Sequence, residues 1–217
     1  TVNQLYIGSG RGGNFNNNVA ELIYYNRGIS ANELARAQSY LGIKYGIHLD
    51  GTAVPNYVAS DGSTIWSNTT NTGYTNTVMG IGRDDNSGLY QRQSKSAIGG
   101  DMLTFGIGSL TSSNVANVGT FSSDKSFLLV GNNGSLTSTI NTTDIPLTPT
   151  TSTSMRMRLG RVWEAQKTGG VGSMELQFDL TGSFSSTVPY QVSELCLLID
   201  KNQNGSFTDE SIGSGGL

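Results

Sequence analysis

The chain has 217 residues, which is enough for one large β domain or two small ones with a hydrophobic core. Charged residues make up 13% of it and the formal net charge is −3, so no basic surface for nucleic acid is expected. No run of about 18 apolar residues occurs, so we expect no membrane-spanning helix. Low charge with many Ser, Thr and Gly residues favours short strands joined by tight turns.

Two β-like segments are expected near the start of the chain. They are residues 4–7 and 19–25, separated by a turn rich in Gly and Asn. In the second segment both faces are largely apolar, so we expect this strand to be covered on both sides, as in a sandwich.

One short amphipathic helix is expected at about residues 31–45. Ser30 and Glu33 have the spacing of a capping box, in which the two side chains satisfy free backbone N–H groups at the start of a helix. Leu34 and Leu41 then recur at helical spacing. Gly46 follows as a stop signal, because glycine readily adopts the left-handed conformation that ends helices.

A resemblance to a known family accompanies this helix. Residues 15–27 (FNNNVAELIYYNR), together with the helix ending at 40–47 (YLGIKYGI), resemble the end of a concanavalin A-like, laminin-G-type jelly roll. Such jelly rolls are common in giant surface proteins of Bacteroidota. The family usually has a glycine where Asn17 or Asn18 stands. We therefore expect residues 1–50 to be the last strands and the helix of an incomplete jelly roll.

The rest of the chain reads as strands and turns. Expected strands lie at residues 57–59, 64–66, 78–81, 88–93, 102–107, 126–130, 155–162 and 173–180. The last two alternate apolar with polar residues and lie about ten residues apart, so we expect a hairpin or meander of an antiparallel sandwich. Residues 136–154, rich in Thr and Ser, are expected to form an exposed loop or an irregular edge.

Several segments in order resemble the domain of unknown function that follows the jelly roll in those surface proteins. They are residues 57–62 (YVASDG), 80–85 (GIGRDD), 91–96, 126–133 (SFLLVGNN), 158–172 (RLGRVWEAQKTGGVG) and 192–209. The resemblance implies that residues 51–217 are an all-β extracellular module. It also implies secretion by the type IX system and no enzymatic activity. The expected fold class is therefore mainly β, an antiparallel β-sandwich or jelly-roll-like module with one helix.

The stretch 195–210 (LCLLIDKNQNGSFTDE) is the strongest candidate for a specific chemistry. After an apolar run, read as a buried strand, oxygen-bearing residues follow at alternate positions around a glycine. Such oxygens suit Ca²⁺. The expected ligands are Asp200, Asn202, Asn204, a backbone carbonyl near Ser206, and Asp209.

This stretch departs from the helix–loop–helix calcium motif at its end. The twelfth position is Ser211 instead of a bidentate glutamate, and no helix pattern precedes Asp200. It is closer to calcium loops at β-hairpins, with affinity on the order of 10⁻⁴–10⁻³ M. The alternative is a plain hairpin turn with Asn-Gly at its tip.

Asp84 and Asp85 form a second acidic turn. They are candidate ligand contacts, as metal ligands or as a carboxylate pair for sugar hydrolysis. Adjacent side chains on a strand point to opposite faces, which disfavours a shared pair. The alternative is an ion pair between Arg83 and a neighbouring carboxylate, followed by a turn.

Trp66 and Trp163 are candidates for a sugar-stacking platform, with core packing as the alternative. His48 is the only histidine and Cys196 the only cysteine, and neither has a partner residue at the spacing of a metal site or a nucleophile–base pair. We expect both to be structural.

The resemblance implies a non-catalytic module of a large, multidomain bacterial cell-surface or secreted protein with an adhesive or structural role, and the pattern around Asp200 adds calcium as a stabilising ion. The alternative is a carbohydrate-binding accessory module of a secreted polysaccharide-degrading enzyme. Expected partners are neighbouring domains of the same polypeptide, neighbouring subunits joined by strand addition, and surface glycans. No nucleic acid, membrane insertion or catalytic residue is expected.

Overall fold

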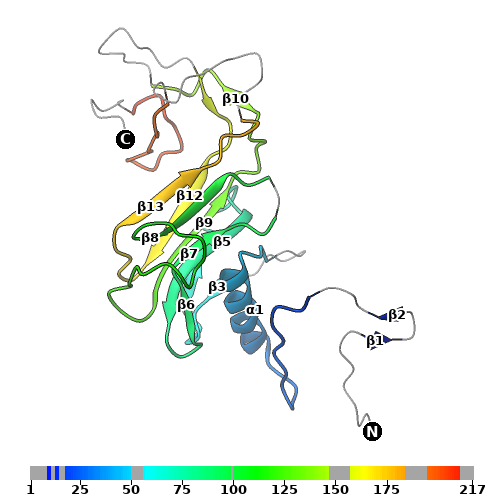
Figure 1. Ribbon diagram of the computed structural model, residues 1–217. Helices are drawn as coiled ribbons and strands as arrows, with labels where there is room; N and C mark the ends of the chain where they lie inside the picture. The colour runs from blue at the N-terminus through cyan, green and yellow to red at the C-terminus, as the bar shows by residue number, and fades with distance from the viewer. Residues whose placement is uncertain are drawn as a thin grey trace. The chain divides into compact units, whose positions relative to one another are not determined.

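The structure is a computed structural model that describes residues 9–10, 13–14, 18–49, 56–98, 100–146, 157–183 and 195–210 (Figure 1). The chain divides into two compact units, Thr1–Ser30 and Ala31–Leu217. No helix within the described ranges is both long enough and apolar enough to cross a membrane.

The first unit contains a short antiparallel pair, β1 (Ser9–Gly10) and β2 (Gly13–Asn14). The strand expected over residues 19–25 is wrong, because this segment joins no ladder and exposes apolar side chains such as Tyr24, which is 69% exposed. Two apolar faces alone do not make a strand, since a strand also needs a neighbour for its backbone groups. The strand expected over residues 4–7 lies outside the described residues.

The second unit begins with α1 (Ala31–Tyr45), which confirms the predicted helix. The helix stops where Gly46 adopts a φ of 62°, and the Ile47 N–H donates to the Gly42 carbonyl at 2.9 Å. A side chain at position 46 would also collide with the backbone, because a Cβ there would lie 2.2 Å from the Lys95 carbonyl oxygen. Glycine is therefore required at this turn for two reasons.

Two antiparallel sheets follow the helix (Figure 1). The larger sheet has the strand order β12 (Trp163–Thr168), β9 (Ser126–Asn132), β5 (Asn76–Asp84) and β6 (Leu89–Gln91). The smaller sheet has the order β13 (Met174–Phe178), β8 (Leu103–Ile107) and β7 (Gln93–Lys95). The described part of the unit also has two short pairs: β3 (Tyr57–Val58) with β4 (Thr64–Trp66), and β10 (Ile140–Asn141) with β11 (Arg158–Leu159).

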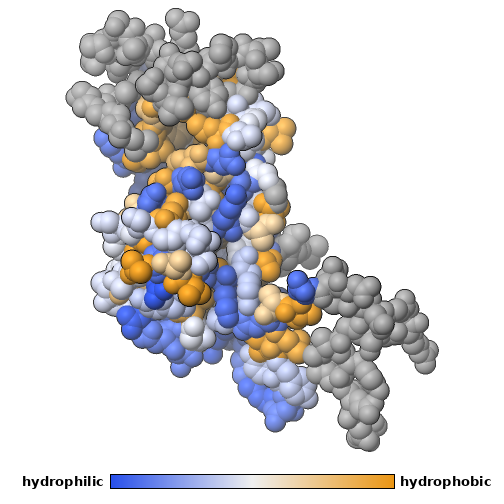
Figure 2. Space-filling model, viewed as in Figure 1, coloured by the Kyte–Doolittle hydropathy of each residue, from blue (hydrophilic) through white to orange (hydrophobic). Residues whose placement is uncertain are grey.

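The larger sheet is the middle layer of three, because β9 is buried on both faces. Phe127 and Leu129 belong to a core shared with α1 and the β3–β4 pair. Leu128 and Val130, which alternate with them, belong to the core shared with the smaller sheet. The protein is therefore mainly β, with sandwiched antiparallel sheets and one helix, as expected. On the face in Figure 2, hydrophilic residues are interspersed with apolar ones over much of the described part.

Most expected strands of the second unit are present, but one expected pairing is wrong. The strands expected at 155–162 and 173–180 do not pair: β11, within the first, pairs with β10, and β13, within the second, pairs with β8. Between them lies β12, which runs along β9 from Trp163 opposite Asn132 to Thr168 opposite Phe127. Alternation in a sequence indicates which face of a strand is buried, but it does not identify the partner strand.

The helix shares its core with the β-strands of the second unit. Ile43 of α1 is 2% exposed and packs with Tyr57 and Trp66. The division of the structure falls after Ser30. The boundary expected near residue 50, between a jelly roll and a following module, stays a prediction.

Candidate functional site

The stretch predicted to bind calcium forms an irregular loop over residues 195–210. Its apolar start is not a buried strand, since Ile199 is 58% exposed and no ladder is formed. Gln203 and Gly205 have φ angles of 58° and 80°, so two sharp left-handed bends fold the loop back on itself. The bends bring the predicted ligand residues together.

Asp200 closes the loop by accepting backbone hydrogen bonds. Its Oδ1 accepts from the Asn204 N–H at 3.3 Å, and its Oδ2 accepts from the Gly205 N–H at 2.8 Å. The amide oxygens of the two asparagines act in the same way: Asn202 Oδ1 accepts from Asn204 N–H (3.2 Å), and Asn204 Oδ1 accepts from Ser206 N–H (2.8 Å). The side-chain oxygens are therefore held on the inside of the turn by the backbone itself.

Asp209 lies opposite these residues. Its Oδ2 accepts from the side-chain Nδ2 of Asn202 at 2.9 Å and of Asn204 at 2.8 Å. These two hydrogen bonds lower the pKa of Asp209, so the carboxylate stays ionised well below neutral pH. Four of the five predicted ligand residues are thus brought together.

Asp144, which the sequence did not single out, lies beside the loop. Its Oδ1 accepts from the Phe207 N–H at 2.7 Å and from the Ser206 hydroxyl at 3.2 Å. Its Oδ2 is paired with the Arg158 guanidinium, whose Nε donates to the Asp144 carbonyl at 2.8 Å. Burial raises the pKa of Asp144, but the hydrogen bonds from Phe207 and Arg158 outweigh that effect and lower it.

Phe207 anchors the loop to this group. It is 7% exposed, and the Arg158 guanidinium lies 4.9 Å from the centre of its ring.

Asp144 lies in the Thr- and Ser-rich stretch expected to be an exposed loop or irregular edge. No signal in that stretch distinguishes it from other polar loop residues.

The residue types gathered here are ones that Ca²⁺ can use, and in this structure the Nδ2 groups of Asn202 and Asn204, not their oxygens, face Asp209. Ca²⁺ takes six to eight oxygen ligands and accepts mixtures of carboxylate, amide and backbone oxygens. An amide oxygen has two lone pairs, so Asn202 and Asn204 can each keep a backbone hydrogen bond and still offer a lone pair. Within the described ranges, no group of three or more His, Cys, Asp or Glu is arranged to hold a metal. A cation here would depend on amide and backbone oxygens, as in weak extracellular sites.

Asp84 and Asp85 do not share a site. Asp84 is 2% exposed and is paired with Lys125, and it also accepts from the Ser60 N–H at 2.8 Å and the Ser60 hydroxyl at 2.7 Å. Asp85 is exposed and binds the Arg83 guanidinium through both oxygens, at 2.7 and 2.8 Å. This is the ion pair and turn that the alternative interpretation predicted.

Trp66 is a core residue in this structure. It is 0% exposed, and its Nε1 donates to Asn68 Oδ1 at 2.9 Å. No ring face is available for a sugar to stack on. Trp163 is partly buried and packs edge-to-face on Phe178, with ring centres 5.4 Å apart.

His48 and Cys196 have structural surroundings. The His48 Nδ1 accepts a hydrogen bond from the Val78 N–H at 3.3 Å, which holds the histidine against β5. Cys196 is half-buried, and burial raises the pKa of its thiol. A raised pKa leaves little thiolate at neutral pH, and the thiolate is the reactive form.

No curated protein and no solved structure matches this chain. One family model does match, over residues 33–214, which includes most of α1, both sheets and the loop around Asp200. This match covers well over half of the 217 residues. The chain therefore belongs to the family described as "Domain of unknown function (DUF8202)".

Proposed function

We propose that this chain is a non-catalytic, structural or adhesive module of a large extracellular bacterial protein, and that calcium fastens its loop over residues 195–210. The observation that carries the proposal is the convergence of four predicted ligand residues, Asp200, Asn202, Asn204 and Asp209. Between them, the backbone N–H of Phe207 is docked on Asp144. A cation bound there would hold a loop in place, because Ca²⁺ in such sites orders backbone and does not activate water.

The setting of the other acidic groups supports a structural role. Asp84 and Asp144 each accept hydrogen bonds from a basic side chain and from backbone N–H groups, and so fasten separate segments of the chain. Carboxylates used in this way stabilise a fold.

The ordered resemblance to modules of Bacteroidota surface proteins supports an extracellular location and type IX secretion. Neighbouring domains of the same polypeptide are the proposed partners. Strand addition by another subunit would use an edge such as β6 or β12. The charged side chains of Glu164 and Lys167 on β12 disfavour that edge, because edge charges oppose pairing.

Calcium binding is the direct test of the proposal. With a dissociation constant of about 10⁻⁴–10⁻³ M, calcium at about 10 mM should stabilise the native state by roughly 1.4–2.7 kcal/mol. We expect EDTA to lower the Tm in thermal unfolding, calcium to restore it, and calorimetric titration to show one weak site. Asp200→Ala should abolish both the Tm shift and the binding heat.

Asp61→Asn is the matched control. Asp61 is an exposed carboxylate in the β3–β4 turn, and Asn keeps the Oδ1 acceptor that the Ser63 N–H uses at 2.8 Å. This variant should respond to calcium as the wild type does. If chelation leaves the Tm unchanged and titration shows no heat, the loop is only a turn and the proposal fails.

The carbohydrate-binding alternative loses its expected aromatic contact, because Trp66 is buried. Replacing Trp66 would damage the core and would not test sugar binding. The observation that still favours sugar recognition is a polar pocket elsewhere on the second unit.

A further inference from the structure

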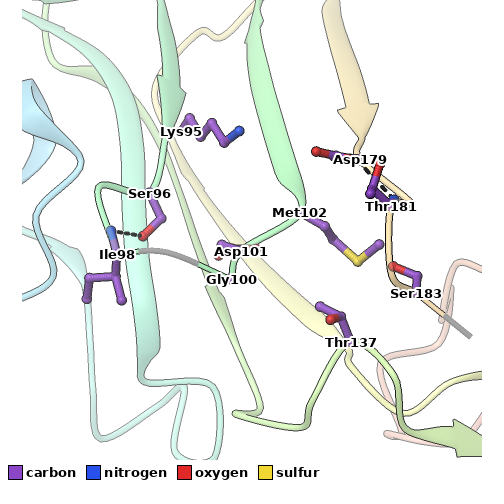
Figure 3. Close-up of a pocket in the computed structure, with 10 residues that line it drawn as sticks. All are labelled: Lys95, Ser96, Ile98, Gly100, Asp101, Met102, Thr137, Asp179, Thr181 and Ser183. Carbon is purple, nitrogen blue, oxygen red and sulfur yellow. Dashed lines mark hydrogen bonds between the residues drawn. The ribbon is translucent and has the colours of Figure 1, made fainter. Parts of the chain in front are cut away.

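A pocket of about 290 Å³ opens beside the smaller sheet, at the ends of β7 and β13 and the start of β8 (Figure 3). Polar side chains dominate its lining, and Met102 and Ile98 supply apolar contact surface. The polar side chains of the lining include those of Lys95, Ser96, Thr137, Asp179, Thr181 and Ser183. Ligand pockets in proteins run from about 300 to 1,000 Å³, so this one suits a very small ligand.

One buried group of the lining has no hydrogen-bond partner among the residues that the structure describes. Ser183 is 6% exposed, and its hydroxyl makes no hydrogen bond to any described residue. In Figure 3 this hydroxyl is directed toward Met102, on the pocket side. Leaving a buried hydroxyl unsatisfied is unfavourable, so this hydroxyl has a hydrogen bond to offer on the pocket side.

Lys95 and Asp179 give the pocket one positive and one negative charge. Their side chains point toward one another from β7 and from the end of β13 (Figure 3). Asp179 uses Oδ1 to accept from the Thr181 N–H at 3.0 Å, and hydrogen bonds from the Thr181 side chain and from this N–H lower its pKa, so the group is ionised at neutral pH. The two charges balance, which favours a neutral ligand.

Asp101 also lines the pocket but is committed to the fold. Its Oδ2 accepts from the Thr77 hydroxyl at 2.8 Å, and Arg161 lies 3.8 Å from its Oδ1. The groups left for a ligand are therefore an ammonium, a carboxylate and several hydroxyls, beside a small apolar surface.

We propose that this pocket binds one neutral sugar residue. A sugar ring presents adjacent hydroxyls that donate to a carboxylate such as Asp179 and accept from an ammonium such as Lys95. The Ser183 hydroxyl gains a hydrogen-bond partner, and the C–H face of the ring rests on Met102. A phosphate would be repelled by Asp179, and a purely apolar ligand would leave both charges unpaired.

The test is saturation-transfer NMR on the full 217-residue chain with glucose, galactose, mannose and N-acetylglucosamine as separate probes. We expect at least one sugar to give a saturable signal. Asp179→Asn and Lys95→Met should each weaken that binding at least tenfold, and Ser183→Ala should weaken it less. Thermal unfolding of each variant without sugar checks that the fold is intact.

Thr70→Ala is the matched control, because Thr70 is an exposed hydroxyl residue outside the pocket. It should bind the sugar as the wild type does. Ser183→Ala distinguishes a binding hydroxyl from an incidental one: it should raise the Tm of the sugar-free protein while weakening sugar binding.

The proposal is overturned if none of the four sugars gives a saturable signal. It is also overturned if sugar binding is unchanged in Asp179→Asn and in Lys95→Met. A rise in Tm with unchanged sugar binding in Ser183→Ala would show that the hydroxyl serves no ligand, which contradicts the assignment. The inference goes beyond the structural role proposed above. It does not depend on calcium, because the two tests use different residues and different readouts.

Discussion

Asp84 shows how a single buried carboxylate is stabilised in this fold. Burial raises the pKa of Asp84, but hydrogen bonds from Lys125 and Ser60 outweigh that effect and hold the pKa below its usual value. A carboxyl group with a lowered pKa in the folded state contributes stability above its unfolded pKa. That contribution is lost as the pH falls through the lower, folded value.

Removing Lys125 should therefore be costly. We expect Lys125→Met to destabilise the protein by about 3 kcal/mol at neutral pH, because it leaves the Asp84 carboxylate buried without its cation. Burial would then raise the pKa of Asp84, so acid unfolding should begin at a higher pH than in the wild type. Denaturant unfolding across a pH series measures both effects.

Lys167→Met is the control for this prediction, since Lys167 is exposed on the edge strand β12. It should change the free energy of unfolding by less than about 0.5 kcal/mol. Equal stabilities of the two variants at neutral pH would show that Asp84 does not need its ion pair.

At the scale of elements, the pairing of β5 with β9 depends on glycines placed opposite large side chains. Gly82 lies opposite Phe127 and Gly80 opposite Leu129, all on the face toward the helix. A Cβ at Gly82 would lie 2.3 Å from Phe127 Cδ1. The large rings and branches of β9 therefore fill the space that β5 leaves empty.

Gly82→Ala should destabilise the protein by about 1–3 kcal/mol, because the added methyl overpacks the core against Phe127. Gly172→Ala is the control: a Cβ there meets only Ile107 Cδ1, at 3.9 Å, and the backbone is not in the left-handed region. Thermal unfolding of the pair measures the difference. A Gly82→Ala variant as stable as Gly172→Ala would show that the ring of Phe127 moves aside freely.

Elements governed by local signals were predicted well from the sequence. The sequence of the helix from Ala31 to Tyr45 has a capping box at its start, apolar residues at helical spacing and a glycine after its end. The helix in the structure has the same bounds. The partner of β13 was not predictable, because pairing with β8 depends on packing about 70 residues away in sequence. β12 was missed as a strand of its own because charged and polar residues interrupt its apolar pattern.

In the candidate site, too, the local pattern was predicted from the sequence and the long-range contact was not. The spacing of Asp200, Asn202 and Asn204 is a local pattern, and the loop does gather them. Asp144 is more than 50 residues away in the chain and reaches the loop only through tertiary structure. No spacing rule connects the two.

At the scale of the whole molecule, the described loop over residues 195–210 is docked on the rest of its unit around Phe207. Phe207 is its buried anchor, with the Arg158 guanidinium over the ring and Asp144 bound to the backbone N–H. The core of the sandwich lies in other residues, on β5, β8 and β9. The loop should therefore open without unfolding the sheets.

Phe207→Ala should release this loop and leave the sandwich folded. Losing roughly 2 kcal/mol of docking would raise the open population roughly thirtyfold, and proteolysis follows that population when opening is fast. We expect faster tryptic cleavage after Lys201, an exposed residue of the loop, with little change in the Tm of the sheets. Leu197→Ala is the matched control, because Leu197 lies in the same segment but is 38% exposed.

Calcium should slow cleavage of the wild type more than that of Phe207→Ala, since a bound ion and a docked ring hold the same loop. Equal cleavage rates in Phe207→Ala and the wild type would show that the loop is held by something other than this anchor.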